Sequence, residues 1–186
     1  MNRREAISSV ALLLGGTILG SQAFLTGCKP SSSDMNFSPD EIAYLDEVSE
    51  TILPKTTTPG AKDAKVGTFM TVIVKDYYEP KDQKVFKDGI AELEKASKKL
   101  NNKGFMESTP EQRHNLLVAL DKEQGDYQKS KKKEDPNHYF RMMKELTLWG
   151  FFTSEVGATQ ALRYVAVPGK YEGCIPYKKG DKAWAT

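Results

Sequence analysis

Cysteine and histidine are scarce in this chain of 186 residues, which contains two of each. Cys28 and Cys174 stand far apart and form no CxxC pair. His114 and His138 fall on different predicted helices, with no cysteine or carboxylate pattern beside them. The spacings of the usual metal sites are therefore missing from the sequence. We expect each histidine to be a surface or helix-capping residue and expect no bound metal.

Signatures for cofactors and nucleic acid are missing as well. The sequence after residue 28 has no GxGxxG motif, which argues against a dinucleotide or flavin fold of the usual kind, and no CxxCH for attached haem. Its 27 Lys and Arg nearly balance its 25 Asp and Glu, for a net charge of +2. This balance gives no electrostatic case for nucleic acid. We expect the chain to bind no cofactor itself.

What is present begins with an export signal. Arg3 and Arg4 precede an uncharged run over residues 6–27, which is only mildly hydrophobic because it contains several Ser, Thr and Gly. Paired arginines before such a run are typical of the twin-arginine export route. A single-span N-terminal anchor stays open as the alternative, because about 20 residues is just long enough to cross a bilayer.

The uncharged run ends in Leu25-Thr26-Gly27-Cys28, which resembles the lipobox of bacterial lipoproteins. There the cysteine is lipidated and becomes the new N-terminus, and several acyl chains on one residue anchor it stably. A polar, Ser-rich tether follows. We therefore predict a signal peptide over residues 1–27, a lipidated tether over 28–36 and one domain over 37–186. The chain is expected on the periplasmic side, held to a membrane by its lipid.

Helical periodicity dominates the predicted domain, and local signals mark several helix ends. Ser38-Pro39 begins a helix with a capping box that Glu41 completes, and Thr109-Pro110 is a second start with a cap and a proline. Pro54 ends the first helix, and Asp135 is expected to cap a later one. Residues 124–137, with their lysine run, are expected to form a solvated loop. The fold class is therefore predicted as all-α, an irregular bundle of five or six helices.

The most apolar stretch, residues 146–169, contains only two charged residues. We expect it to be a helix through about Tyr164, with the other helices packed around it. Pro168-Gly169 then turns the chain into an extended aromatic C-terminal tail, which we expect to lie over the bundle.

Three segments in order carry a family resemblance. They are residues 51–54 (TILP) with 58–61 (TPGA), residues 150–157 (GFFTSEVG), and the pattern PGxYxG over 168–173 with the closing Trp184. Together with the twin-arginine signal, they resemble the small subunit of membrane-associated gluconate 2-dehydrogenase, the subunit 3 family. The resemblance covers most of the mature chain, roughly residues 37–185.

The resemblance implies a subunit that does no chemistry itself. It implies pairing with a large FAD-bearing dehydrogenase of the glucose–methanol–choline type, often with a cytochrome c subunit that carries haem. It also implies that the signal of the small subunit can carry the large one across the membrane. The lipobox cysteine departs from the family pattern and suggests anchoring through this chain's own lipid. The family name leaves the substrate open among gluconate, glucose, other sugars and other alcohols.

An interface with the large subunit is expected at the three segments, because aromatic residues dominate such contacts. The candidates are Leu53, Pro54, Pro59, Gly60, Phe151, Phe152, Tyr171, Tyr177 and Trp184. Ordinary core packing is the alternative, and it is favoured more for residues 149–152 than for the tail. An independent enzyme could use only Glu155 and Asp181 as acid–base groups. A stand-alone periplasmic lipoprotein that binds a ligand or envelope component would need a deep apolar pocket.

Overall fold

The structure is a computed structural model that describes residues 35–167, 169–170 and 172–185. The chain separates into residues 1–35 and residues 36–186, and the description below concerns the second unit. The predicted signal peptide and nearly all of the tether, including Arg3, Arg4 and Cys28, lie outside the described residues. The described elements are α2 (Pro39–Ile52), α3 (Val66–Asp76), α4 (Pro80–Asn101), α5 (Pro110–Ser130), α6 (Tyr139–Thr153) and the short π-helix η1 (Gly157–Ala161).

The two predicted helix starts at Ser38 and Thr109 are confirmed, and each is a capping box. The Ser38 hydroxyl accepts a hydrogen bond from the Glu41 N–H, and the Glu41 carboxylate accepts one from the Ser38 N–H. Thr109 and Gln112 repeat the exchange at the start of α5. Each box satisfies N–H groups that a helix N-terminus would otherwise leave unpaired. These helix starts are therefore decided by residues within one turn of each other.

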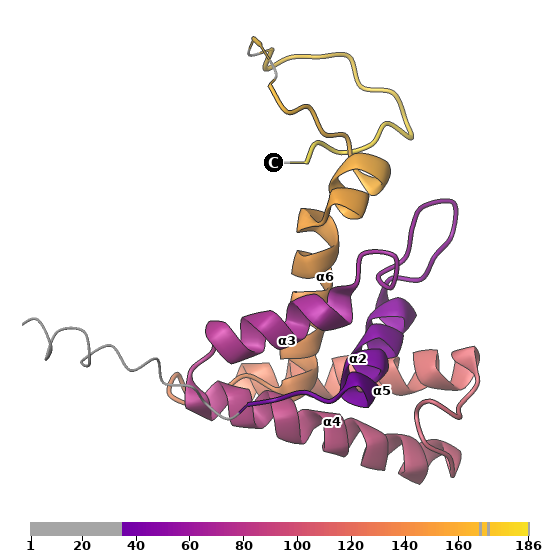
Figure 1. Cartoon of the computed structure of the whole chain (residues 1–186), viewed down its shortest axis with the longest axis vertical. Coiled ribbons are helices and arrows are strands. Elements are labelled where there is room, and N and C mark those ends of the chain that lie inside the picture. Colours follow the sequence, from indigo (N-terminus) through magenta and orange to yellow (C-terminus); the bar gives the residue numbers. More distant parts are fainter. Residues whose placement is uncertain (1–34, 168, 171, 186) are drawn as a thin grey trace, which may run out of the picture. The chain divides into compact units, whose positions relative to one another are not determined.

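Helix α6 lies at the centre of the bundle, as the apolar stretch predicted. It packs against α2, α3, α4 and α5, and Figure 1 shows it running past α3 and α2 to α4 and α5. Its side chains Phe140, Met143 and Leu146 are buried together with Leu45, Met70, Phe86 and Leu93 from the surrounding helices. The described residues form no named strand, so the predicted all-α class is confirmed.

The predicted helix through Tyr164 is wrong, because α6 ends at Thr153. Ser154 adopts an extended conformation (ψ 157°), and its hydroxyl accepts a hydrogen bond from the Gly157 N–H at 3.0 Å. A side chain at position 157 would collide with the backbone carbonyl of Phe151. Ser154 therefore starts a new turn, and glycine at 157 lets that turn fold closely against the end of α6.

The predicted boundary between α5 and α6 also needs correction. Helix α5 continues to Ser130, so the first half of the loop expected over residues 124–137 is helical. The residue that caps α6 is His138 and not Asp135, because the His138 Nδ1 accepts a hydrogen bond from the Phe140 N–H at 3.2 Å. The capping role expected for a histidine is thus confirmed at His138. Burial lowers the pKa of this imidazole, although the nearby Glu123 carboxylate acts to raise it. The lowered pKa favours the neutral imidazole, whose Nδ1 can accept the hydrogen bond.

A partly buried ion-pair network ties α2 to α5 and to the loop after α2. The Glu47 carboxylate binds both Lys62 and Arg113, whose side chain is 13% exposed. Burial alone would raise the pKa of Glu47, but the Lys62 hydrogen bond and the charge of Arg113 outweigh it, so the pKa is lowered. The Arg113 guanidinium also donates to the Phe105 and Met106 carbonyls, which holds the turn before α5.

Candidate partner-binding surface

The first predicted segment folds back on the end of α2 as a closed loop. The Ala61 N–H donates to the Leu53 carbonyl at 3.0 Å, which closes the loop over residues 53–61. The Glu50 carboxylate accepts hydrogen bonds from the backbone N–H groups of Lys55 and Lys62 and fills the space beside Gly60. Gly60 is buried by this carboxylate, so its role is to permit the close approach.

The same loop meets the second segment. Residues 55–59, with Asp63, face Val156 and Gln160 across an open hollow of about 450 Å³. Two of the three predicted segments therefore lie together at one end of α6. Pro54 is exposed and Pro59 half-buried there, so both remain available to a partner, whereas Leu53 packs partly against the core.

Phe151 and Phe152 have opposite environments although they are neighbours. Phe151 is 4% exposed and belongs to the hydrophobic core, whereas Phe152 is 38% exposed. Their rings meet edge to face with centroids 5.1 Å apart. Phe151 and Gly60 are each covered by this chain, which favours the alternative of ordinary core packing at these two positions.

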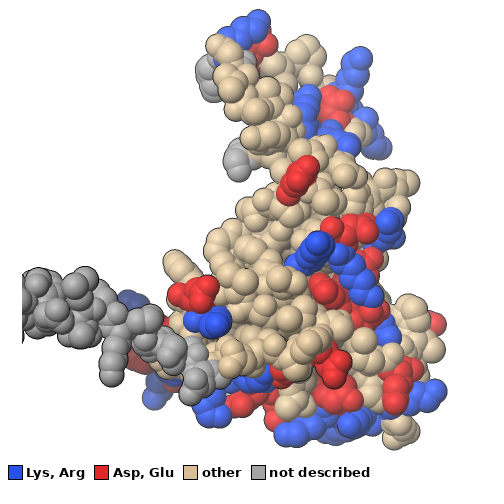
Figure 2. All heavy atoms as spheres, in the orientation of Figure 1, with Lys and Arg blue, Asp and Glu red and all other residues tan. Residues whose placement is uncertain are grey.

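Four large apolar side chains are exposed on the packed helices α3 and α6, and we name them the aromatic face. They are Val72 from α3 and Leu148, Trp149 and Phe152 from α6. The Trp149 ring packs edge to face on Phe69 at 5.3 Å, which joins the two helices and fixes the indole. Figure 2 shows a surface largely free of Lys, Arg, Asp and Glu over α3 and the C-terminal half of α6.

Sequence reasoning missed Val72 and Leu148, because both are aliphatic residues just beside buried positions of their helices. The only available signal was position: Leu148 and Phe152 are four residues apart and share one side of α6, next to Trp149. Large apolar side chains grouped on a surface mark sites that bind another protein, a ligand or a membrane.

The tail forms a loop of its own, which we name the arm, residues 162–185. Its two ends pair, since the Arg163 N–H donates to the Ala183 carbonyl at 2.8 Å and the Ala185 N–H donates to the Arg163 carbonyl at 2.9 Å. Trp184 packs on the Arg163 guanidinium, and Lys182 donates to the Gln160 carbonyl. Figure 1 shows the arm beyond η1, and the course over the bundle stays a prediction.

The predicted tail residues have different environments in the arm. Tyr177 is 75% exposed. Trp184 is 47% exposed and contributes one face of its indole to the Arg163 contact. Tyr171 lies outside the described residues. Of the expected anchors in the tail, Tyr177 is thus free to contact a partner, and Trp184 already has an internal role.

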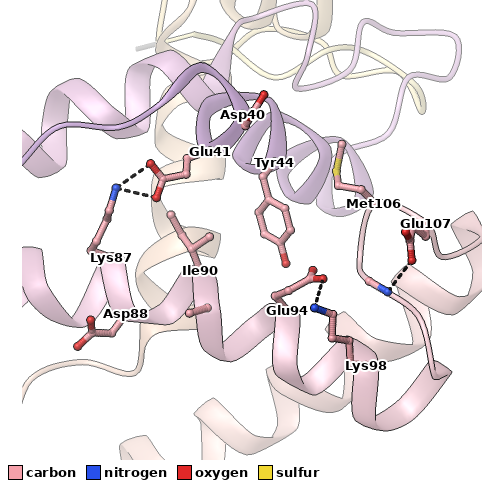
Figure 3. A pocket seen from close by; sticks show the side chains of 12 residues that line it. Asp40, Glu41, Tyr44, Lys87, Asp88, Ile90, Glu94, Lys98, Met106 and Glu107 are labelled. Atoms are coloured by element: carbon pink, nitrogen blue, oxygen red, sulfur yellow. Dashed lines mark hydrogen bonds and ion pairs between the residues drawn. The ribbon is translucent and has the colours of Figure 1, made fainter.

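A separate groove of about 610 Å³ lies between α2 and α4. Figure 3 shows its floor at Ile90 and Tyr44 and its rim of paired charges, including Glu41 with Lys87 and Glu94 with Lys98. The Tyr44 hydroxyl is buried without a hydrogen-bond partner, and burial with the negative charge of Glu94 raises its pKa, so it stays protonated. This groove is open, with apolar residues along its floor and charged residues at its rim.

The two acid–base groups that an independent enzyme could use are both at the surface of the described part of the chain. Glu155 and Asp181 are both exposed, and the Asp181 carboxylate accepts from the Lys178 N–H at 2.9 Å within a turn. Within residues 35–185, apart from the undescribed positions, no three His, Cys, Asp or Glu side chains are grouped to hold a metal ion. None of the described helices combines the length and apolar character that a membrane span needs.

Comparison with known proteins gives a family. No curated protein and no solved structure matches the chain. The model of the family described as gluconate 2-dehydrogenase subunit 3 matches residues 39–169, from the start of α2 to the first half of the arm. This match spans most of the chain and contains the aromatic face and the closed loop over residues 53–61. The chain therefore belongs to the gluconate 2-dehydrogenase subunit 3 family.

Proposed function

We propose that this chain is the small, non-catalytic subunit of a membrane-associated FAD-dependent dehydrogenase that oxidises a sugar or sugar acid. Family membership implies a small subunit of a gluconate 2-dehydrogenase type of complex. In this proposal the chain binds, stabilises and helps to export the large flavoprotein subunit, and a cytochrome c subunit with haem can complete the complex. FAD belongs to the large subunit.

The observation that carries the proposal is the aromatic face. Trp149 is 45% exposed, although its ring is fixed in place by Phe69. A rigid, half-exposed indole beside Phe152 has the character of an interface anchor, since Trp and Tyr contribute large contact areas with little loss of side-chain freedom. The loop over residues 53–61, with Pro54 exposed and Pro59 half-buried, lies at the same end of α6 and offers the partner a further contact.

Localisation is part of the proposal. We propose export by the twin-arginine route through Arg3 and Arg4, followed by attachment to the membrane through lipidated Cys28. The sequence supports this proposal through its paired arginines and its lipobox. An anchor on the small subunit would hold the flavoprotein at the membrane, where a cytochrome subunit could take its electrons.

The test is purification of the native complex through an affinity tag at the C-terminus of the full chain. Membranes of the native host are solubilised, and flavin is measured per mole of tagged chain. We expect one FAD-containing subunit, identified by its flavin spectrum and by mass spectrometry, to co-purify in a fixed ratio. Recovery of the folded chain with no flavoprotein would contradict the proposal.

A further inference from the structure

The arm has a charge that sets it apart from the helices. It carries five basic and two acidic side chains, for a net charge of +3, whereas residues 35–161 carry 19 basic and 21 acidic ones, for a net charge of −2. The basic residues of the arm are Arg163, Lys170, Lys178, Lys179 and Lys182, and the acidic ones are Glu172 and Asp181. The arm is thus a positively charged appendage on a slightly acidic unit.

Apolar side chains are exposed along the same loop. Those with large exposed fractions are Tyr164, Val165, Val167, Ile175 and Tyr177. Val167 is 81% exposed and Tyr177 75% exposed, so the helices of this chain do not cover them. Apolar groups that stay in water forgo the stabilisation that burial would give, and an exposed apolar surface of this kind is characteristic of a binding site.

The base of the arm is nevertheless closed. The Arg163 guanidinium carbon lies 3.8 Å from the centroid of the Trp184 ring, within the range of a cation–π contact, and two backbone hydrogen bonds flank this pair. We name this closure the latch. Beside the latch lies an open hollow of about 470 Å³, lined by residues from both ends of the arm and from η1.

We propose that the arm is a clasp for the flavoprotein subunit, pre-closed by the Arg163–Trp184 latch. The inference rests on the proposed function and names the partner surface that the arm fits: an apolar recess rimmed by carboxylates. The exposed Tyr177 and Ile175 enter the recess, and Lys178 and Lys179 pair with its rim. Arg163 and Trp184 are positioning residues that contact the partner little.

The latch contributes by limiting the freedom of the unbound loop. A loop whose ends are already joined has fewer conformations to lose when it binds, so more of its contact energy appears as affinity. The arm also starts directly after η1, at the same end of α6 as Phe152 and the loop over residues 53–61. One partner can therefore cover the aromatic face and be held by the arm.

The experiment uses the full-length tagged chain, purified with its flavoprotein from the native host. The purified complex is diluted, and the flavin that stays bound per mole of tagged chain measures the affinity. Trp184→Ala opens the latch, and Trp184→Phe keeps an aromatic face for Arg163. Lys178→Glu with Lys179→Glu reverses charge on the arm. The matched control is Lys132→Glu with Lys133→Glu, an exposed lysine pair between α5 and α6.

We expect Trp184→Ala to weaken flavoprotein binding about tenfold and Trp184→Phe to restore most of it. Amide hydrogen exchange at Arg163 and Ala185 should accelerate in the alanine variant, while circular dichroism melting of the helices stays unchanged. The variant with Lys178→Glu and Lys179→Glu should bind the flavoprotein about tenfold more weakly at low salt, and the loss should be much smaller at high salt. The control variant should bind as tightly as wild type at both salt concentrations.

Two outcomes overturn the clasp while the proposed function stands. In the first, the latch opens by hydrogen exchange but flavin retention is unchanged, although Phe152→Ala lowers it. In the second, the arm variants keep full flavin retention. The same arm substitutions, placed in the unlipidated Cys28→Ala chain, abolish its binding to vesicles that contain phosphatidylglycerol. This result would make the arm a lipid contact. If the wild-type chain retains no flavoprotein at all, the proposed function fails first.

Discussion

Phe151 and Phe152 offer the sharpest test of which residues belong to the core and which to the partner surface. They are adjacent, chemically identical and on one helix, so the same substitution at each isolates the effect of environment. Phe151 is 4% exposed and Phe152 is 38% exposed. Their alanine variants should therefore separate stability from binding.

Phe151→Ala removes a fully packed ring. Such a substitution costs about 3–5 kcal/mol, which combines the lost transfer free energy with the cavity that remains. For a domain of this size, that loss lowers the melting temperature by roughly 6–20 °C. Phe152→Ala removes a ring that is only partly covered, so we expect a loss of about 1–2 kcal/mol in proportion to its covered fraction.

Binding should respond in the opposite order. Phe152→Ala removes apolar area from the aromatic face, and we expect flavoprotein retention to fall about tenfold or more if the ring lies near the centre of the contact. Circular dichroism melting and flavin content of the purified complex measure the two effects on the same samples. Equal losses of stability in both variants would refute the burial assignment. Unchanged flavin retention in Phe152→Ala would refute the aromatic face as the interface.

Three other outcomes test the anchor, the export route and the ion-pair network. Cys28→Ala should release the chain from membranes or leave it unprocessed, and unchanged attachment and processing would exclude the lipobox. Replacing Arg3 and Arg4 by Lys should hold this chain and its flavoprotein in the cytoplasm, because lysine lacks the planar donor geometry of arginine; normal export of both would point to another route. Because the folded-state pKa of Glu47 is lowered, its ionised form stabilises the fold above the ordinary glutamate value of 4.5, and this contribution is lost as the pH falls through the folded pKa. Glu47→Gln should therefore be less stable than wild type at neutral pH, with a gap in chemical denaturation that narrows below pH 4.5; a gap independent of pH would exclude the ionic contribution.

Local sequence determined where several helices start and that the domain is helical. The boxes at Ser38 and Thr109 involve residues three positions apart, so they form whatever the rest of the chain does. Apolar residues at helical spacing such as Leu45 and Leu116 are buried. The family resemblance was equally a property of the sequence, and the family match over residues 39–169 confirms it.

The tertiary structure decided the end of α6 and the character of the residues around it. Neighbours on a helix point in directions about 100° apart, so which of Phe151 and Phe152 is buried depends on where α2, α3 and η1 pack. The end at Ser154 depends on a backbone approach that only glycine at 157 allows. The closure of the arm depends on Arg163 meeting Trp184, residues too far apart in sequence for any local pattern to pair them.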